Sequence, residues 1–138
     1  MKQHSPKDLA NYRLDDAKEK LDSAKILLHE QHFKDFLSRS YYSMFTAVRA
    51  LLALKGFDSS KHSGIISLFN QHFVKTRLIS SDCGRILKKA QYSRERSDYG
   101  DFTVVTRKET EQQIRDAEKL LAEIKVIIFE PLDKDVSK

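Results

Sequence analysis

The sequence predicts an all-α fold, an up-and-down four-helix bundle with one additional short helix, and three observations lead to that prediction. Apolar residues recur at spacings of three and four along four long segments, which is the period of an amphipathic helix. The chain has only four Gly and two Pro, too few for the many turns of a sandwich or barrel. Its 138 residues suit one domain. We therefore expect a single domain over residues 1–138, with its core at about 6–129 and a frayed tail at 130–138.

The first helix is predicted to begin beside Ser5. The Ser5 hydroxyl can cap the free N–H groups, Pro6 suits the first helical position, and Asp8 places an acid in the positive first turn. The positions predicted to face the core follow at helical spacing, and they are Leu14, Ala17, Leu21, Ala24 and Leu28. The polar residues 29–32 should then break the chain.

Residues 33–54 are too long a segment for a strand and too apolar for a surface helix, so we expect them to form the central helix. Small residues fill most of the side opposite the apolar stripe, which lets neighbouring helices approach closely. Tyr42 and Arg49 lie on that opposite edge. The sequence leaves open whether Tyr41 or Tyr42 faces the core.

Two further helices are expected in the middle of the chain. A short helix is predicted within residues 61–76, after a break that contains Gly56, and His62 lies at its beginning. Residues 80–82 offer an N-cap for the next helix, which is predicted to run to about Ser97 before a loop.

The last helix is predicted to begin with a capping box, in which Thr106 and Glu109 satisfy each other's backbone N–H groups. Glu111 and Arg115 should pair across one turn, and Pro131 should end the helix. Its predicted apolar seam consists of Ile114, Ala117, Leu121, Ile124 and Ile128.

The charge of the chain is unevenly distributed. The net charge is +5, and residues 1–97 hold 18 Lys and Arg against 10 Asp and Glu, whereas residues 98–138 hold 7 against 10. A basic excess can favour nucleic acid or nucleotide phosphates, although such an excess is also common on solvated surfaces.

The composition and the missing motifs weigh against several kinds of functional site and against a membrane or secreted location. The single cysteine, Cys83, cannot form an intramolecular disulfide or a cysteine-clustered metal site. The chain has no apolar run of about 18 residues and no hydrophobic signal core at its start, so we expect a cytoplasmic protein that does not enter a membrane. Phosphate-loop, dinucleotide, zinc-protease and nucleophile-elbow motifs are missing, and we expect neither a metal nor a cofactor.

The candidate site is the segment 91–101, QYSRERSDYGD, where the fourth helix should end. There Arg94, Asp98 and Tyr99 could hold a phosphate by the guanidinium, orient a hydroxyl through the carboxylate and stack a base on the ring. The same residues also fit an ordinary ion pair between Arg94 and Asp98, with Tyr99 covering the bundle end. His62 could bind phosphate or carry a proton, or could simply be a surface residue.

The blocks SRSYYSMFTAVRALLALKG, KHSGIISLFNQHFVKT and GRILKKAQYSRERSDYGD follow one another in an order that resembles the HEPN domain family. Within it, the chain is similar to small stand-alone bacterial and archaeal proteins often encoded beside a minimal nucleotidyltransferase. The resemblance extends from about Leu9 to Ile128. It implies a bundle of four or five helices that commonly forms a homodimer.

The resemblance also implies a possible activity. Many HEPN proteins are metal-independent RNases whose motif is an Arg followed, after four to six residues, by a His, in a cleft shared by two subunits. Arg94 matches the motif arginine, but after four intervening residues the chain presents Tyr99, and none of its five histidines lies downstream of Arg94. A phenol, with an ordinary pKa near 10, is a poorer proton carrier at neutral pH than an imidazole near 6.5. This departure weighs against RNA cleavage.

Three functions follow from these observations. The first is a nucleotide- or RNA-binding module, homodimeric and acting with a nucleotidyltransferase partner in a toxin–antitoxin-like system, in which Arg94, Asp98 and Tyr99 bind the ligand beside Tyr42 and His62. The second is an endoribonuclease in which Arg94 stabilises the phosphate and Tyr99 or His62 handles protons. The third is a structural protein that only dimerises or docks another protein through an exposed apolar edge of the central helix.

Overall fold

The computed structural model describes residues 4–129, and five α-helices account for most of them. The predicted frayed tail and the predicted stop at Pro131 lie outside the described residues. The helices are α1 (Pro6–His29), α2 (Phe33–Leu54), α3 (His62–Phe69), α4 (Ser81–Tyr99) and α5 (Arg107–Phe129), and a π-helical turn, η1 (Asn70–Val74), continues α3.

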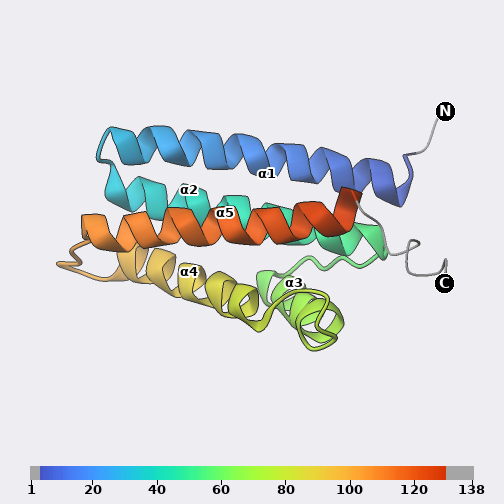
Figure 1. Cartoon of the computed structure of the whole chain (residues 1–138). Coiled ribbons are helices and arrows are strands. Elements are labelled where there is room, and N and C mark those ends of the chain that lie inside the picture. Colours follow the sequence, from blue (N-terminus) through green and yellow to red (C-terminus); the bar gives the residue numbers. More distant parts are fainter. Residues whose placement is uncertain (1–3, 130–138) are drawn as a thin grey trace.

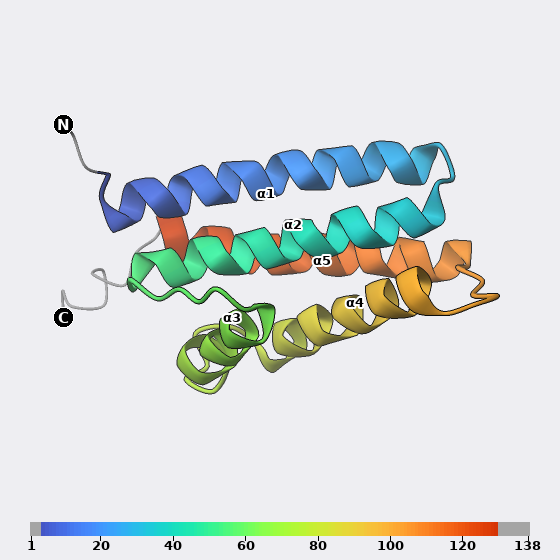
Figure 2. The same cartoon turned by 180° about the vertical axis from the view of Figure 1, so that it is seen from behind.

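The four long helices run alternately up and down, and α3 packs near the start of α4 (Figure 1). Seen from behind, α2 lies between α1 above and α3 with α4 below, while α5 lies on its far side (Figure 2). This arrangement confirms the predicted all-α bundle with one additional short helix. Within the described residues, none of the helices is long and apolar enough to cross a membrane.

Helix α2 supplies the centre of the core, as predicted. Phe36, Leu37, Tyr41, Met44 and Leu51 are all fully buried on it. Because α1, α4 and α5 pack around this helix, its apolar half does not form the exposed edge that a purely docking function would need. The exposed apolar side chains near the end of α4 and in the loop after it are instead Tyr92, Tyr99, Phe102 and Val104.

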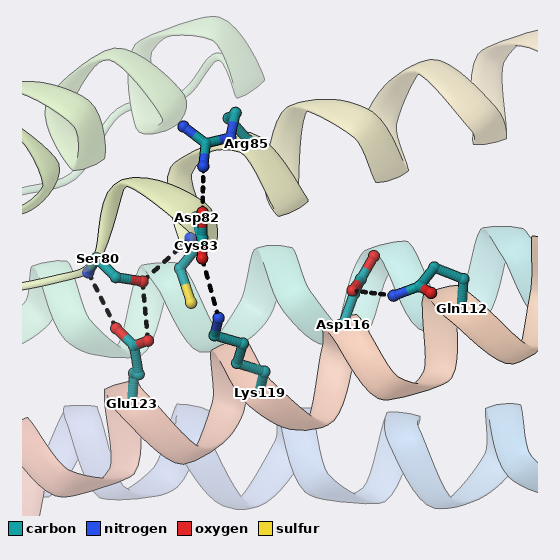
Figure 3. Close-up of polar contacts among 8 residues, drawn as sticks. All are labelled: Ser80, Asp82, Cys83, Arg85, Gln112, Asp116, Lys119 and Glu123. Atoms are coloured by element: carbon teal, nitrogen blue, oxygen red, sulfur yellow. Dashed lines mark hydrogen bonds and ion pairs between the residues drawn. The ribbon is translucent and has the colours of Figure 1, made fainter.

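The predicted caps form at two of the three helix starts. At α1, the Ser5 hydroxyl accepts from the Asp8 N–H at 3.0 Å, and the Asp8 carboxylate accepts from the Ser5 N–H at 3.1 Å. At α4, the Ser80 hydroxyl accepts from the Cys83 N–H at 3.3 Å. Both the Ser80 N–H (3.0 Å) and its hydroxyl (2.8 Å) donate to Glu123 of α5, which fastens the start of α4 to that helix (Figure 3).

The third cap is only half of the predicted box. Thr106 accepts from the Glu109 N–H at 3.1 Å, but the Glu109 carboxylate accepts instead from the guanidinium of Arg96 at 2.6 Å. The stronger, charge-assisted bond with Arg96 replaces the predicted bond between the Glu109 carboxylate and the Thr106 N–H. It also joins the end of α4 to the start of α5. The predicted Glu111 pairing is also wrong, because Arg115 donates to Gln112 at 3.0 Å.

Candidate functional site

Helix α4 is longer than predicted, and this changes the setting of the candidate site. It continues two residues beyond Ser97 to Tyr99, so Asp98 and Tyr99 lie on the last helical turn rather than in a loop. Asp98 is therefore one turn beyond Arg94, and the Arg94 Nε lies 3.4 Å from the Asp98 carboxylate, an ion pair without a hydrogen bond. The Arg94 side chain is 18% exposed and that of Asp98 is 35% exposed.

Arg94 packs against aromatic rings of α2. Its guanidinium carbon lies 5.0 Å from the ring centre of Tyr42 and 5.8 Å from that of Tyr41. These distances fall within the range of a cation–π contact. The rings fix the guanidinium at the surface between α2 and α4, where it can still meet an anion.

The two tyrosines have different roles. Tyr41 is fully buried, its hydroxyl has no partner within the described residues, and its side chain belongs to the core. Burial, reinforced by the neighbouring Tyr42 and only partly opposed by Arg94, raises the pKa of Tyr41 to about 12. Tyr42 is half-buried rather than fully buried, so it is the tyrosine available to a ligand.

His62 joins the same group of side chains from the first residue of α3. Its ring stacks on Phe45 at 4.1 Å and meets the Tyr42 ring edge-on at 6.0 Å. The distances from Arg94 to Tyr42 (5.0 Å) and from Tyr42 to His62 (6.0 Å) place the guanidinium and the imidazole no more than 11.0 Å apart. We call Arg94, Asp98, Tyr42 and His62 the Arg94 cluster.

Tyr99 stands apart from this cluster. It lies five residues beyond Arg94, about 140° further around the helix, and is 77% exposed. Within the described residues, no contact joins its ring to Arg94, to Tyr42 or to His62. The structure thus brings together four of the five predicted site residues, and it separates the fifth from them.

The structure adds cationic residues that sequence reasoning did not place in the site. Arg39 is exposed and lines a groove of about 510 Å³ between α1 and α2, together with Lys20 and Tyr42. Arg49 lies two turns beyond Tyr42 on the same face of α2. The spacing of Arg39, Tyr42 and Arg49 at three and seven residues was the signal that could have identified this face.

Similar proteins are known. Residues 10–127 match the model of a family described as the HEPN domain. A "UPF0332 protein" of Thermotoga maritima is 37% identical over 112 residues, which cover 81% of this chain and 85% of that protein. A "putative toxin" of Methanocaldococcus jannaschii is 35% identical over 84% of this chain and 86% of its own length. A "UPF0332 protein" of Pyrococcus horikoshii is 52% identical over 44% of this chain and 43% of that protein.

Proposed function

The chain belongs to the HEPN domain family, and on that basis we propose that it is a nucleotide- or RNA-binding module. In this proposal it acts in the cytoplasm as a homodimer, with a nucleotidyltransferase partner, in a toxin–antitoxin-like system. The description of the Methanocaldococcus jannaschii relative as a "putative toxin" supports the last element.

The observation that carries the proposal is the position of Arg94 over Tyr42. A guanidinium held on a half-buried ring is oriented before a ligand arrives, so it can contact a phosphate with little further loss of side-chain freedom. The exposed imidazole of His62 and the edge of Tyr42 offer adjacent surfaces on which a base can stack. The Asp98 carboxylate, one turn along α4, can accept a hydrogen bond from a ribose hydroxyl.

Binding measurements on the full chain test this proposal. Labelled short RNAs, ATP and GTP are titrated at low salt into the wild type, into Arg94→Gln and into Arg115→Gln, which removes an exposed arginine from α5. Arg94→Gln should weaken binding about tenfold, because a charge-assisted contact is lost, and the Arg115 variant should bind like the wild type. Equal affinities for all three proteins would refute the assignment of the site.

A second candidate function, RNA cleavage, is favoured by the position of His62. In that reaction the ribose 2′-hydroxyl attacks the adjacent phosphorus and gives its proton to His62, the P–O5′ bond breaks, and the departing oxygen takes up a proton from solvent. Arg94 stabilises the additional negative charge on the phosphoryl oxygens. His62, rather than Tyr99, is the proton carrier in this scheme because Tyr99 lies outside the Arg94 cluster.

The RNA-cleavage function can be tested separately from RNA binding. Purified protein should cleave RNA in the presence of EDTA, and both His62→Ala and Arg94→Ala should abolish the cleavage. If the RNA instead remains intact after incubation with the wild-type protein, under conditions in which the protein binds it, that result would refute RNA cleavage and leave RNA binding as the function.

A further inference from the structure

A second group of cationic side chains surrounds a pocket next to the Arg94 cluster. The pocket has a volume of about 260 Å³ and lies where the loop after α2 meets the start of α3. Its polar lining consists of Arg49, Ser59, Ser60, Lys61 and His62, and apolar side chains form the remainder. The volume is sufficient for a phosphate group with its ester oxygens, and the lining offers such a group the cations of Arg49 and Lys61 and the donors of two serine hydroxyls, with no carboxylate among the lining side chains.

Arg49 keeps donors free for a ligand. Its guanidinium lies 3.5 Å from Asp58, which it shares with Arg13 at 3.7 Å, and neither contact is close enough to count as a hydrogen bond. The Arg49 Nε is buried and has no hydrogen-bond partner within residues 4–129, so the donors that a ligand can reach are those of the partly exposed remainder of the guanidinium. Burial, together with the nearby Arg49, lowers the pKa of Arg13, as expected when two guanidinium groups share one carboxylate. An added anion would relieve that repulsion.

The backbone of the loop is shaped to form this pocket. Ser59 packs so closely against the first turn of α3 that a Cβ atom at Gly64 would lie 2.1 Å from the Ser59 hydroxyl oxygen and 2.8 Å from its Cβ. The Lys61 N–H donates to the Ser59 hydroxyl at 3.2 Å, which turns the chain into α3. The start of α3 has no side-chain cap, so its free N–H groups add positive potential to a pocket that already holds cations.

His62 connects the pocket to the Arg94 cluster. It lines the pocket, and its ring meets Tyr42, on which Arg94 lies. Tyr42 and Arg49 are seven residues apart on α2, so the Arg49 side of the pocket is about 10.5 Å along the helix from the ring on which a base would stack, while His62 brings the opposite side next to that ring. A nucleotide whose phosphate lies on Arg94 directs only its base toward His62, so a second phosphate, farther along the nucleotide chain, is needed at Arg49 and Lys61.

We propose that the pocket at Arg49 and Lys61 binds a backbone phosphate of a single-stranded RNA whose neighbouring nucleotide lies at the Arg94 cluster. This inference rests on the proposed binding of RNA by Arg94. It narrows the ligand class from nucleotides in general to RNA strands of several nucleotides, because only a strand can occupy both places.

The test compares the binding of uridine monophosphate with that of hexauridylate to the 138-residue chain. Lys61→Gln is the principal variant, because Lys61 has no ion-pair partner in the part of the chain that the structure describes. Arg49→Gln is the second variant, Arg94→Gln reports on the Arg94 cluster, and Lys125→Gln, on the exposed face of α5, is the control. Thermal unfolding is recorded for each variant so that affinities are compared only between folded proteins.

We expect Lys61→Gln to weaken hexauridylate binding about fivefold, and to reduce the slope of log affinity against log salt by about 0.7, since one phosphate contact is lost. Its affinity for uridine monophosphate should equal that of the wild type. Arg94→Gln, in contrast, should lower the affinity for both ligands. If Lys61→Gln and Arg49→Gln bind hexauridylate as Lys125→Gln does, while Arg94→Gln does not, the pocket is not a subsite and the proposed function stands. If Arg94→Gln binds both ligands like the wild type, the proposed function itself is overturned.

Discussion

The guanidinium of Arg94 lies 5.0 Å from the ring centre of Tyr42, and this contact joins α4 to α2 at the surface of the bundle. The ring presents its electron-rich face to the cation, while the Asp98 carboxylate lies 3.4 Å from the Nε of the same guanidinium. The Tyr42 ring and the Asp98 carboxylate together restrain the position of the guanidinium.

Replacing Tyr42 should separate stacking from hydrogen bonding. Tyr42→Phe keeps the ring and should bind RNA within about twofold of the wild type, whereas Tyr42→Leu should lose about 1–3 kcal/mol of binding free energy, the usual value of one base–aromatic stack. Fluorescence anisotropy with a labelled oligonucleotide measures both. Similar losses in the two variants would show that the hydroxyl, rather than the ring, contacts the ligand.

Tyr41 provides a test of stability. Its hydroxyl is buried without a partner in residues 4–129, so Tyr41→Phe removes an unsatisfied polar group and should leave the free energy of unfolding unchanged or raise it by about 1 kcal/mol. Tyr41→Ala should lower it by about 3–5 kcal/mol, because it opens a cavity in the core. Urea unfolding measures both changes. A clear loss of stability in Tyr41→Phe would mean that the hydroxyl has a partner after all.

The contact between Glu123 and Ser80 should make stability depend on pH. Burial raises the pKa of Glu123, but the hydrogen bonds from the Ser80 N–H and hydroxyl, together with Cys83 and the charge of Lys119, outweigh it, so the pKa in the folded protein is below its ordinary value. The stabilisation is then present above the pKa of unfolded glutamate, near 4.3, and is lost as the pH falls through the lower folded value.

Glu123→Gln should therefore lower the free energy of unfolding by about 1 kcal/mol at pH 7, and the difference from the wild type should shrink as the pH falls below about 4. Guanidinium unfolding at a series of pH values measures this difference. Glu111→Gln, an exposed change on the same helix, is the matched control. A difference that stays constant down to pH 2 would contradict the assigned ion and hydrogen-bond pattern.

The thiol of Cys83 should be unreactive in the folded protein. Cys83 is fully buried, and burial raises its pKa to about 11, with the adjacent Ser80 side chain opposing this and Glu123 reinforcing it. The thiolate is the reactive form, so alkylation at pH 8 should be slow in buffer and fast in concentrated urea. Mass spectrometry follows the labelled fraction over time, and rapid labelling without denaturant would show that the start of α4 opens readily.

The proposed homodimer predicts a mass of twice that of the chain in light scattering. Phe102 is fully exposed in the loop after α4 with a positive φ of 58°, an uncommon conformation for a bulky apolar residue. If the partner subunit covers this ring, Phe102→Ser should weaken dimerisation about tenfold or more, since burial of a Phe side chain contributes about 1.5–3 kcal/mol. Val126→Ser, on α5, is the control, and a monomeric wild type would refute the dimer.

Local patterns predicted most of the fold. The ends of α2 and the cap of α1 followed from apolar spacing and from Ser5, Pro6 and Asp8, all of which act within a few residues. The predictions failed where distant residues decide. The Glu109 carboxylate accepts a hydrogen bond from Arg96 instead of capping its own helix as the local pattern predicts. The π-helical turn after Phe69 has no distinctive signal in the sequence.

The site was only partly predictable for the same reason. The pairing of Arg94 with Asp98 is set by one helical turn and could be predicted. The position of His62 beside Tyr42 depends on the path of the loop between α2 and α3, and the separation of Tyr99 depends on two additional residues of helix. Neither the loop path nor the exact end of a helix can be obtained from spacing alone.

The close approach of Ser59 to Gly64 has a consequence for how proteins of this fold could diverge. A single methyl group at position 64 would displace one wall of the pocket while leaving every charged residue unchanged. Two such chains with identical cations could therefore select ligands of different lengths, and a comparison of their basic residues alone would not reveal it.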